Sequence, residues 1–374
     1  MGTRNPEDYF NHFNDTIEPF EPEMLSRGPF IRENSEIKDY YKLGSRWYNA
    51  LIRAYKAENV KIIGEKGSLI DGMDCYDELG EEAYRGPHAI CFIKCSNVYL
   101  SGYEIVNSSN WAHSMWYCNN LELSYITVNA GHDGCHFRRC NNIYIHNSVF
   151  STGDDCIAGY NNRNMAVENC ELNTACSAFR LGATNVLIQN CHAYGPPKHL
   201  MRYVLSQEDK IAGVHDVPKD REWNYMLSFY TYYASVNHYT KDNPGNENVL
   251  IRNCKVENAD RFLHYNFSGN EPWQSGSPLL DIKFENANFA AYLKVVKVDS
   301  ETGKTIPYAG AAFEIYNPQG ELVEMTTTYP NVVKHTQFKT NAEGYLITPE
   351  VLEYGLQYSI VEVSAPYGYV LDQT

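Results

Sequence analysis

The central part of the chain repeats itself, and this repeat restricts the possible folds more than any other feature. Five short phrases of β-prone residues each open with an asparagine. The opening residues are Asn97, Asn120, Asn142, Asn164 and Asn185, at intervals of 23, 22, 22 and 21 residues. Such a period, without the apolar spacing of a helix, predicts a solenoid of stacked β coils. Because the leucine signature of leucine-rich repeats is absent, a parallel β-helix is the preferred interpretation.

Counting from each opening asparagine aligns the coils and predicts which side chains become neighbours. The column that lies thirteen residues further on contains Asn110, Asp133, Asp155 and Ser177. Stacked coils pair as parallel strands about 4.8 Å apart, so Asp133 and Asp155 are predicted neighbours. The column three residues after this one should face solvent beside the acids, because the side chains of the columns before and after it point into the core. Its members are His113, His136, Ala158 and Arg180.

Cysteines follow the same register. Cys95, Cys118 and Cys140 each precede an opening asparagine by two residues, whereas Cys170, Cys191 and Cys254 each follow one by six. Ladders of this kind predict buried thiols and not disulfides. No pair of the 11 cysteines has the Cys-x-x-Cys spacing, so we expect no zinc site and assign no metal or cofactor.

The predicted alignment of the coils brings three carboxylates together. Asp133 comes from a His-Asp-Gly motif, and Asp154 and Asp155 come from a Gly-Asp-Asp-Cys motif. Ionising three close carboxylates costs energy, so one should keep its proton, and a mixed protonation state suits general acid and base chemistry. In an inverting glycosidase, an acid protonates the leaving oxygen while a carboxylate about 6.5 to 9.5 Å away activates water. The simpler alternative is that these motifs only form turns between strands.

These motifs resemble those of the polygalacturonase family, family 28 of the glycoside hydrolases. The residues that carry the resemblance are Arg-Gly-Pro at 85–87, Asn107, Trp111, His113, His-Asp-Gly at 132–134 and Ser-Thr-Gly-Asp-Asp-Cys-Ile-Ala at 151–158. The resemblance covers roughly residues 45 to 290. It implies a right-handed parallel β-helix that hydrolyses pectin-like or related glycans with inversion. By position, Asp154 would be the general acid, and Asp133 with Asp155 would hold and activate the water.

Two motifs of that family are missing. Its Gly-His-Gly histidine would fall near Ser177, and its Arg-Ile-Lys motif, which grips a uronate carboxylate, is not found as such. Glycoside hydrolysis is therefore better supported than specificity for galacturonate. The expected substrate-binding residues are Asn110, His113, His136, Ser177, Arg180, Lys198 and Arg202. The aromatic-rich segment 223–233 is either a wall of the carbohydrate cleft or the core of an extra coil.

Composition limits the partners. The formal net charge of -15 disfavours nucleic acid and gives no general attraction to polyanionic pectin. No apolar run is long enough to span a membrane, and no signal peptide is recognised at the N-terminus. The partner that the acidic motifs and the resemblance imply is a carbohydrate substrate, and the charge gives weight to a neutral or only locally charged sugar.

A second domain is expected from residue 291. Its short alternating strands resemble the Cna protein B-type, or SpaA-like, pilin module of Gram-positive surface proteins. The resemblance implies an isopeptide bond from a lysine to Asn or Asp, with Lys297 as the lysine and Glu362 as the glutamate that promotes it. The acceptor strand is expected beyond Thr374, which would leave Lys297 unbonded and the sandwich incomplete. Its open edge could then pair with another chain.

The sequence thus predicts an all-β protein with a parallel β-helix and a small prealbumin-like or immunoglobulin-like β-sandwich. The expected parts are a cap or partial leading segment at 1–44, the catalytic β-helix at 45–290 and a truncated module at 291–374. We expect a secreted or cell-wall-attached Gram-positive hydrolase, of either endo or exo action, truncated at both ends. One alternative is a calcium-dependent polysaccharide lyase whose acids bind metal. The other is a non-catalytic carbohydrate-binding surface adhesin.

Overall fold

The computed structural model describes residues 3–9, 48–81, 84–201, 224–233, 246–265, 278–291, 293–327, 331–353 and 356–371. The chain divides into two compact units, Met1–Ala287 and Asn288–Thr374. Apart from the short 3-10 helix η1 (Pro6–Tyr9), every helix or strand in these described ranges is a strand. The predicted all-β class is therefore confirmed. No helix in the described part of the chain is long and apolar enough to cross a membrane.

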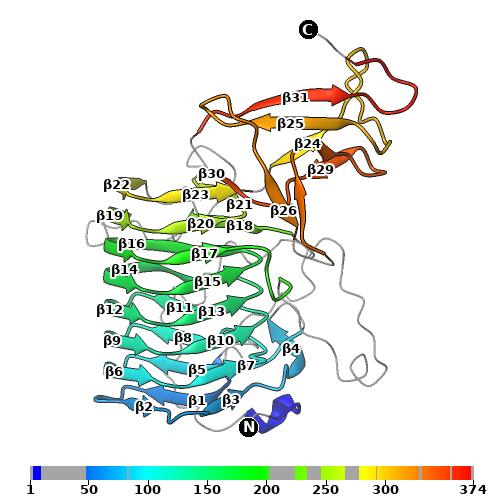
Figure 1. Ribbon diagram of the computed structural model, residues 1–374. Coiled ribbons are helices and arrows are strands. Elements are labelled where there is room, and N and C mark those ends of the chain that lie inside the picture. The colour runs from blue at the N-terminus through cyan, green and yellow to red at the C-terminus, as the bar shows by residue number, and fades with distance from the viewer. Residues whose placement is uncertain are drawn as a thin grey trace. The chain divides into compact units, whose positions relative to one another are not determined.

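The first unit is a parallel β-helix whose coils carry three stacks of strands (Figure 1). The first stack contains β1 (Ala50–Tyr55), β5 (His88–Ile93), β8 (His113–Trp116), β11 (Cys135–Arg138), the start of β14 (Ile157–Glu168), the start of β16 (Ser177–Gln189), β18 (Met226–Tyr232) and β21 (Ala259–His264). The second contains β2 (Lys61–Ile63), β6 (Ser96–Ser101), β9 (Asn119–Ser124), β12 (Asn141–His146), the ends of β14 and β16, β19 (Asn246–Arg252) and β22 (Leu279–Glu285). The third contains β3 (Leu69–Asp71), β7 (Glu104–Val106), β10 (Thr127–Ala130), β13 (Val149–Thr152), β15 (Glu171–Thr174), β17 (His192–Tyr194) and β20 (Lys255–Glu257).

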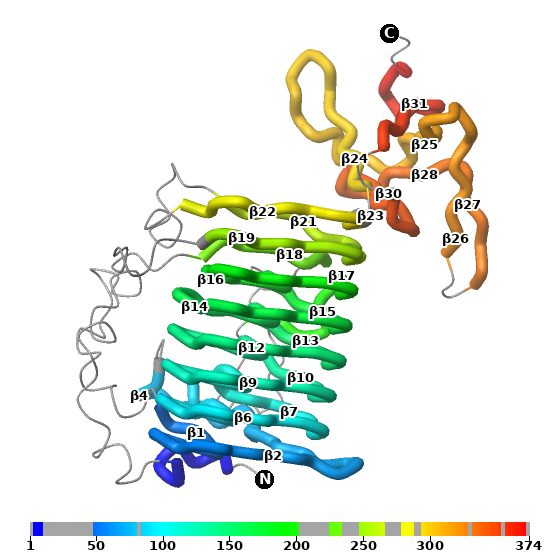
Figure 2. Tube along the Cα trace, turned by 90° about the vertical axis from the view of Figure 1, so that its left-hand side faces the viewer, coloured from blue at the N-terminus to red at the C-terminus, as the bar shows by residue number. Residues whose placement is uncertain are grey.

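The opening asparagines recur because each one occupies a turn that few residues tolerate. Asn97, Asn120 and Asn142 have φ angles of 53°, 56° and 56°, in the left-handed region where asparagine is favoured. Their side chains also form a ladder along the second stack, and Figure 2 shows the backbone of this stack. Asn120 Nδ2 donates to Asn97 Oδ1 at 2.9 Å, and Asn142 Nδ2 donates to Asn120 Oδ1 at 2.9 Å. The repeat seen in the sequence is thus the repeat of this turn.

The interval of 63 residues between Asn185 and Asn248 is one lengthened coil. β19 pairs directly with β16, and Asn248 Nδ2 donates to Asn185 Oδ1 at 2.9 Å. Within this coil, β18 pairs with β16 in the first stack. The side chains of Phe229 and Tyr230, which belong to the aromatic-rich segment, are fully buried. This favours the core interpretation for these two residues, whereas Trp223 lies outside the described residues.

The core contains the predicted thiols. All eleven cysteines are free and buried, which confirms the expectation of thiols without disulfides. Burial raises the pKa of Cys91 to about 12, so this group stays protonated at neutral pH. Aliphatic side chains of the second stack, such as Leu100, Leu123 and Ile145, lie in register from coil to coil and are fully buried.

The predicted register is wrong by one residue in the first of the aligned coils. Cys135 pairs with His113, where Ala112 was expected, while the pairing of Cys135 with Ile157 agrees with the expectation. The reason is the position of the extra residue in this coil. Val106 still pairs with Asn129, so the additional residue lies between Val106 and His113. Counting from Asn97 therefore aligned Ala112 with Cys135, one residue too early.

The second unit is a small antiparallel β domain. Its strands are β23 (Asn288–Ala291), β24 (Lys294–Val296), β25 (Ala312–Tyr316), β26 (Met325–Thr327), β27 (Val333–His335), β28 (Phe338–Lys339), β29 (Tyr345–Ile347), β30 (Leu352–Glu353) and β31 (Ser359–Ser364). β25 lies between β28 and β31, and β24 pairs with β29. A separate core of Ala311, Phe313, Ile315, Met325, Phe338 and Leu346 holds the unit together.

Candidate active site

The three acids lie in the turns that lead from the third stack into the first. Asp133 precedes β11, and Asp154 with Asp155 precedes β14. Backbone hydrogen bonds stack these turns in register, since Gly134 N–H donates to the carbonyl of Asp155 at 2.9 Å. Asp133 and Asp155 therefore occupy equivalent places in successive coils.

The residues around the acids explain the local sequence. The Thr152 hydroxyl donates to the backbone carbonyl of Asp154 at 2.7 Å, and the Thr174 hydroxyl donates to the same oxygen. Gly153 is required because a β-carbon there would lie 2.0 Å from the carbonyl oxygen of Leu200. A β-carbon on Gly134 would lie 2.6 Å from the ring of Phe150. The two glycines thus let the turns approach the neighbouring backbone and core.

Each acid has its own basic partner. His136 Nδ1 lies 2.6 Å from Asp133 Oδ2, and Arg180 lies 3.5 Å from Asp155 Oδ2. Arg85 lies 3.9 Å from Asp154 Oδ2. The three acids are 0–3% exposed, so this is a buried network of opposite charges and hydrogen bonds.

Burial governs the protonation of this cluster. Burial raises the pKa of Asp133 well above its usual value, and Asp154 and Asp155 raise it further. Arg85 and Arg180 lower this pKa. Burial and then Asp154 raise the pKa of Asp155, whereas Arg180 lowers it. The cluster therefore holds on to protons in a pH range where isolated aspartates have lost them, as acid and base chemistry requires.

We predict that Asp133→Asn increases the free energy of unfolding at pH 8. A raised carboxyl pKa stabilises the native state at low pH, and this stabilisation is lost as the pH rises from the usual aspartate value through the raised one. An amide removes that loss, and its oxygen still accepts the hydrogen bond of His136. Urea denaturation measures the free energy of unfolding at pH 4 and at pH 8. The variant should exceed wild type by more at pH 8 than at pH 4.

Asp281→Asn is the control for this comparison. The side chain of Asp281 is 56% exposed and lies on β22, away from the acids in sequence. Its free energy of unfolding should stay within about 0.5 kcal/mol of wild type at both pH values. An Asp133→Asn variant that loses stability between pH 4 and pH 8 as steeply as wild type contradicts the prediction.

Of the expected binding residues, several lie at the acids. His136 and Arg180 contact Asp133 and Asp155 as described, and Ser177 N–H donates to Asp155 Oδ1 at 3.1 Å. Asn110 contacts the cluster indirectly, because its Oδ1 accepts a hydrogen bond of 3.5 Å from Arg85. These side chains are buried or largely buried, so the expectation that this column faces solvent is wrong for His136, which is 3% exposed.

His113 does not lie beside the acids, and its expected position is corrected. Its ring is fully buried, with Nδ1 2.9 Å from the carbonyl of Gly134 and Nε2 2.9 Å from the hydroxyl of Tyr103. Burial lowers the pKa of His113 to about 4, so the ring is neutral at physiological pH. The one-residue shift in register described above turns this side chain inward.

Of the remaining two expected residues, the structure describes only Lys198. Lys198 is exposed, its backbone N–H donates to Asn173 Oδ1 at 2.8 Å, and its ammonium lies over the ring of Tyr194. Arg202 lies outside the described residues.

Sequence reasoning assigned no individual role to four residues of the site, although Thr231 and Tyr233 lie in the segment 223–233 that it offered as a wall of the cleft. Arg138 Nε donates to His136 Nε2 at 3.1 Å, and the hydroxyls of Ser177 and Thr231 lie 2.9 Å apart. The ring of Tyr233 lies 4.3 Å from the guanidinium of Arg180. The fourth is Arg85, whose motif was recognised without a role for its side chain. Two of the four, Thr231 and Tyr233, belong to the lengthened coil, whose register no repeat in the sequence reveals.

Asp154, Asp155 and Cys176 could each offer one atom to a metal ion, and these atoms lie within 4.8 Å of one another. Calcium prefers six to eight oxygen ligands, and a thiol is a poor ligand for it. The positive charge of Arg180 also lies 3.5 Å from Asp155 Oδ2 and disfavours a cation beside it. The donors present in the described residues therefore do not fit a calcium site.

The fold is a parallel β-helix with acidic turns, and two family models match parts of the chain. Residues 38–176 match the model of glycosyl hydrolases family 28, and residues 291–374 match that of the SpaA prealbumin-like fold domain. The chain thus carries a family 28 polygalacturonase-like domain and a C-terminal SpaA prealbumin-like domain.

Curated relatives are similar over short stretches. A probable polygalacturonase of Arabidopsis thaliana is 30% identical over 124 residues, which are 29% of this chain and 27% of that protein. A polygalacturonase of Malus domestica is 34% identical over 77 residues, which are 19% of this chain and 17% of that protein. The chain therefore spans less than a third of the length of either relative.

Two solved structures are similar in fold. The polygalacturonase from Erwinia carotovora ssp. carotovora has 15% identity and a TM-score of 0.41, over 64% of this chain and 69% of that one. PfbA, a surface adhesin of Streptococcus pneumoniae, has 12% identity and a TM-score of 0.41, over 66% of this chain and 60% of that one.

Proposed function

We propose that the β-helix unit is a glycoside hydrolase that cleaves an O-glycosidic bond of a poly- or oligosaccharide with inversion. The observation that carries the proposal is the convergence of Asp133, Asp154 and Asp155 in two stacked turns, where burial raises the pKa of Asp133 and Asp155. Asp154 is the proposed general acid that protonates the leaving oxygen. Asp133 and Asp155 are the proposed residues that hold the water and remove its proton.

The surroundings of the acids support a sugar ligand. Trp111 stacks on His136 with ring centres 3.7 Å apart, and Tyr233 lies over Arg180. Sugar-binding sites often contain aromatic rings next to polar groups, and these two rings are 5% and 4% exposed. Arg85 and Arg180 already face the acids, so we assign neither to a uronate carboxylate. The proposed substrate is a pectin-like or related glycan, with neutral sugars included.

The test is a panel of plant and host glycans, with the anomer of the first product followed by NMR. We expect at least one glycan to be cleaved and its first product to have inverted configuration. A first product of retained configuration contradicts the inverting mechanism. An unsaturated, ultraviolet-absorbing product that disappears with a chelator would identify a lyase.

A second candidate function is a carbohydrate-binding adhesin without turnover. It is favoured by the absence of a histidine near Ser177 and by the SpaA prealbumin-like domain at residues 291–374. In that case the glycan panel shows binding, and neither wild type nor acid variants release a product. Under either function, we propose that the protein acts outside the cell, attached to the wall of a Gram-positive bacterium.

For the second unit we propose a role of Lys297 and Glu362 in an isopeptide bond. Lys297 Nζ donates to Glu362 Oε2 at 2.7 Å, and both side chains are largely buried. In a protein that contains the Asn or Asp acceptor, we expect a mass lower by one ammonia for Asn or by one water for Asp. Lys297→Met should abolish this loss, and an unchanged mass of a protein that contains the acceptor contradicts the proposal.

A further inference from the structure

We propose that Asp133, His136 and Arg138 form a relay in which His136 stays neutral, with its proton on Nδ1, and positions Asp133. His136 and Arg138 act through Asp133, so both are positioning residues. The role in catalysis rests on the proposed function, whereas the tautomer of His136 does not.

The tautomer follows from the hydrogen-bond chemistry of the three side chains. His136 and Arg138 are two residues apart on β11 and therefore project from the same face of the strand. Arg138 Nε donates to His136 Nε2 at 3.1 Å, and an arginine nitrogen can only donate. His136 Nε2 must then be the acceptor and carries no proton. The proton of the ring lies on Nδ1 and is donated to Asp133 Oδ2, 2.6 Å away.

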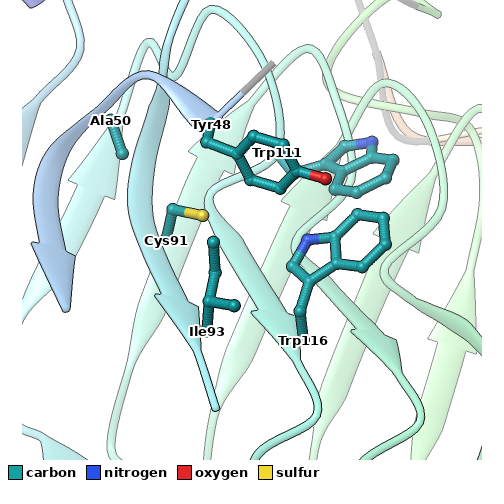
Figure 3. Close-up of a cluster of buried hydrophobic side chains, with 6 residues drawn as sticks. All are labelled: Tyr48, Ala50, Cys91, Ile93, Trp111 and Trp116. Carbon is teal, nitrogen blue, oxygen red and sulfur yellow. The ribbon is translucent and has the colours of Figure 1, made fainter. Parts of the chain in front are cut away.

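Arg138 also explains why His136 stays neutral. The side chain of Arg138 is 3% exposed, and its guanidinium lies 4.9 Å, 4.3 Å and 5.1 Å from the rings of Trp111, Trp116 and Tyr160. Such an aromatic cage stabilises a buried cation. Trp111 and Trp116 belong to one buried cluster, shown in Figure 3. A second positive charge on His136, directly beside this fixed one, would be repelled.

Uncharged residues pack against the His136 ring. In the paired strands, Ser114 and Ala158 lie opposite His136, and both are uncharged. The ring of Trp111 covers one face, and Tyr233 meets the ring edge to face at 6.4 Å. Four further charged groups of the site act on Asp133. They are Asp154, Asp155, Arg85 and Arg180.

The relay fixes the orientation of Asp133. With Oδ2 bound to His136, the carboxylate cannot rotate freely, and Oδ1 is left to hold the water of the proposed reaction. The positive charge of Arg138 is coupled to the carboxylate through the neutral ring. Loss of either positioning residue should therefore change the protonation and the orientation of Asp133 without removing the carboxylate.

The tautomer is tested by two-bond ¹H–¹⁵N NMR on the full chain labelled with [¹⁵N]histidine, with His136 assigned from the spectrum of His136→Asn. We expect a protonated Nδ1 and an unprotonated Nε2 from pH 5 to 8. In Arg138→Met, His136 should lose this fixed tautomer and titrate. The matched control is Arg139→Met, because Arg139 is the next residue and lies over Tyr117, outside the relay.

Two results would overturn the relay. One is a wild-type His136 that carries its proton on Nε2 or is an imidazolium at neutral pH. The other is an Arg138→Met spectrum in which His136 is unchanged. The wild-type spectrum decides the tautomer even if no glycan is cleaved, so failure of the relay and failure of the proposed function are distinguishable.

The positioning role is tested by pH profiles of kcat. Asparagine places an amide N–H close to the position of Nδ1, so His136→Asn should keep the donor to Asp133 and most of the turnover. His136→Ala should lose about 10²-fold in kcat, the size expected for a misplaced catalytic group. It should also shift the part of the pH profile of kcat in which the catalytic base loses its proton. Equal losses in both variants with unchanged profiles indicate a merely structural histidine and overturn the positioning role.

Discussion

Asp154→Asn is expected to lower kcat on a cleaved glycan by about 10²- to 10⁴-fold, with little change in substrate binding. The size is that of a lost general acid, because an amide has no proton to give to the leaving oxygen. The geometry should survive, since Asp154 Oδ1 accepts the backbone N–H of Asp155 at 3.1 Å and an amide oxygen can do the same. Initial rates and binding isotherms on the same glycan measure the two quantities.

Glu122→Gln is the matched control for this carboxylate. Its side chain is 45% exposed on β9 in the second stack, where it lies 3.3 Å from His146. The rate of this variant should equal that of wild type. A rate of Asp154→Asn close to wild type would falsify the assignment of the general acid. Binding without turnover in both wild type and variant would support the adhesin.

Phe150→Ala is expected to lower the free energy of unfolding of the β-helix by about 3–5 kcal/mol, the usual cost of a buried aromatic replaced by alanine. Phe150 is fully buried on β13, between Val128 and Leu172 of the neighbouring coils. Its ring also packs beneath Gly134, so the cavity would open directly under the turn that carries Asp133. We therefore expect loss of turnover well below the unfolding transition as well.

Urea denaturation followed by tryptophan fluorescence measures this effect in the first unit alone, because the five tryptophans lie at positions 47, 111, 116, 223 and 273. The control is Tyr125→Ala, since this ring is 63% exposed and its removal should cost at most about 0.5 kcal/mol. Similar costs for the two variants would show that the core under the acids does not carry the stability assigned to it.

Much of the β-helix could be predicted because its rules are local. An asparagine in a left-handed turn opens each coil, alternation directs side chains inward or outward, and cysteines recur at fixed offsets from the turn. Asp133 and Asp155 follow the second and third opening asparagines by the same number of residues. Their stacking therefore required no knowledge of distant contacts.

The errors arose where this local counting fails. The extra residue between Val106 and His113 shifted one coil, and counting alone could not decide on which side of Asn110 it lies. The lengthened coil between Asn185 and Asn248 hid the position of β18, and with it Thr231 and Tyr233. Such insertions change the register without leaving any periodic signal.

The sequence by itself determined the stacked coils, the register of the three acids, the buried thiols and the antiparallel C-terminal domain. Only the tertiary structure decided which basic group faces each acid, that His113 points inward, and that Arg138 accompanies His136. The physical reason is the range of the interactions. Turn conformation and alternation depend on neighbours along the chain, whereas the charge and burial of a site depend on side chains that separate coils bring together.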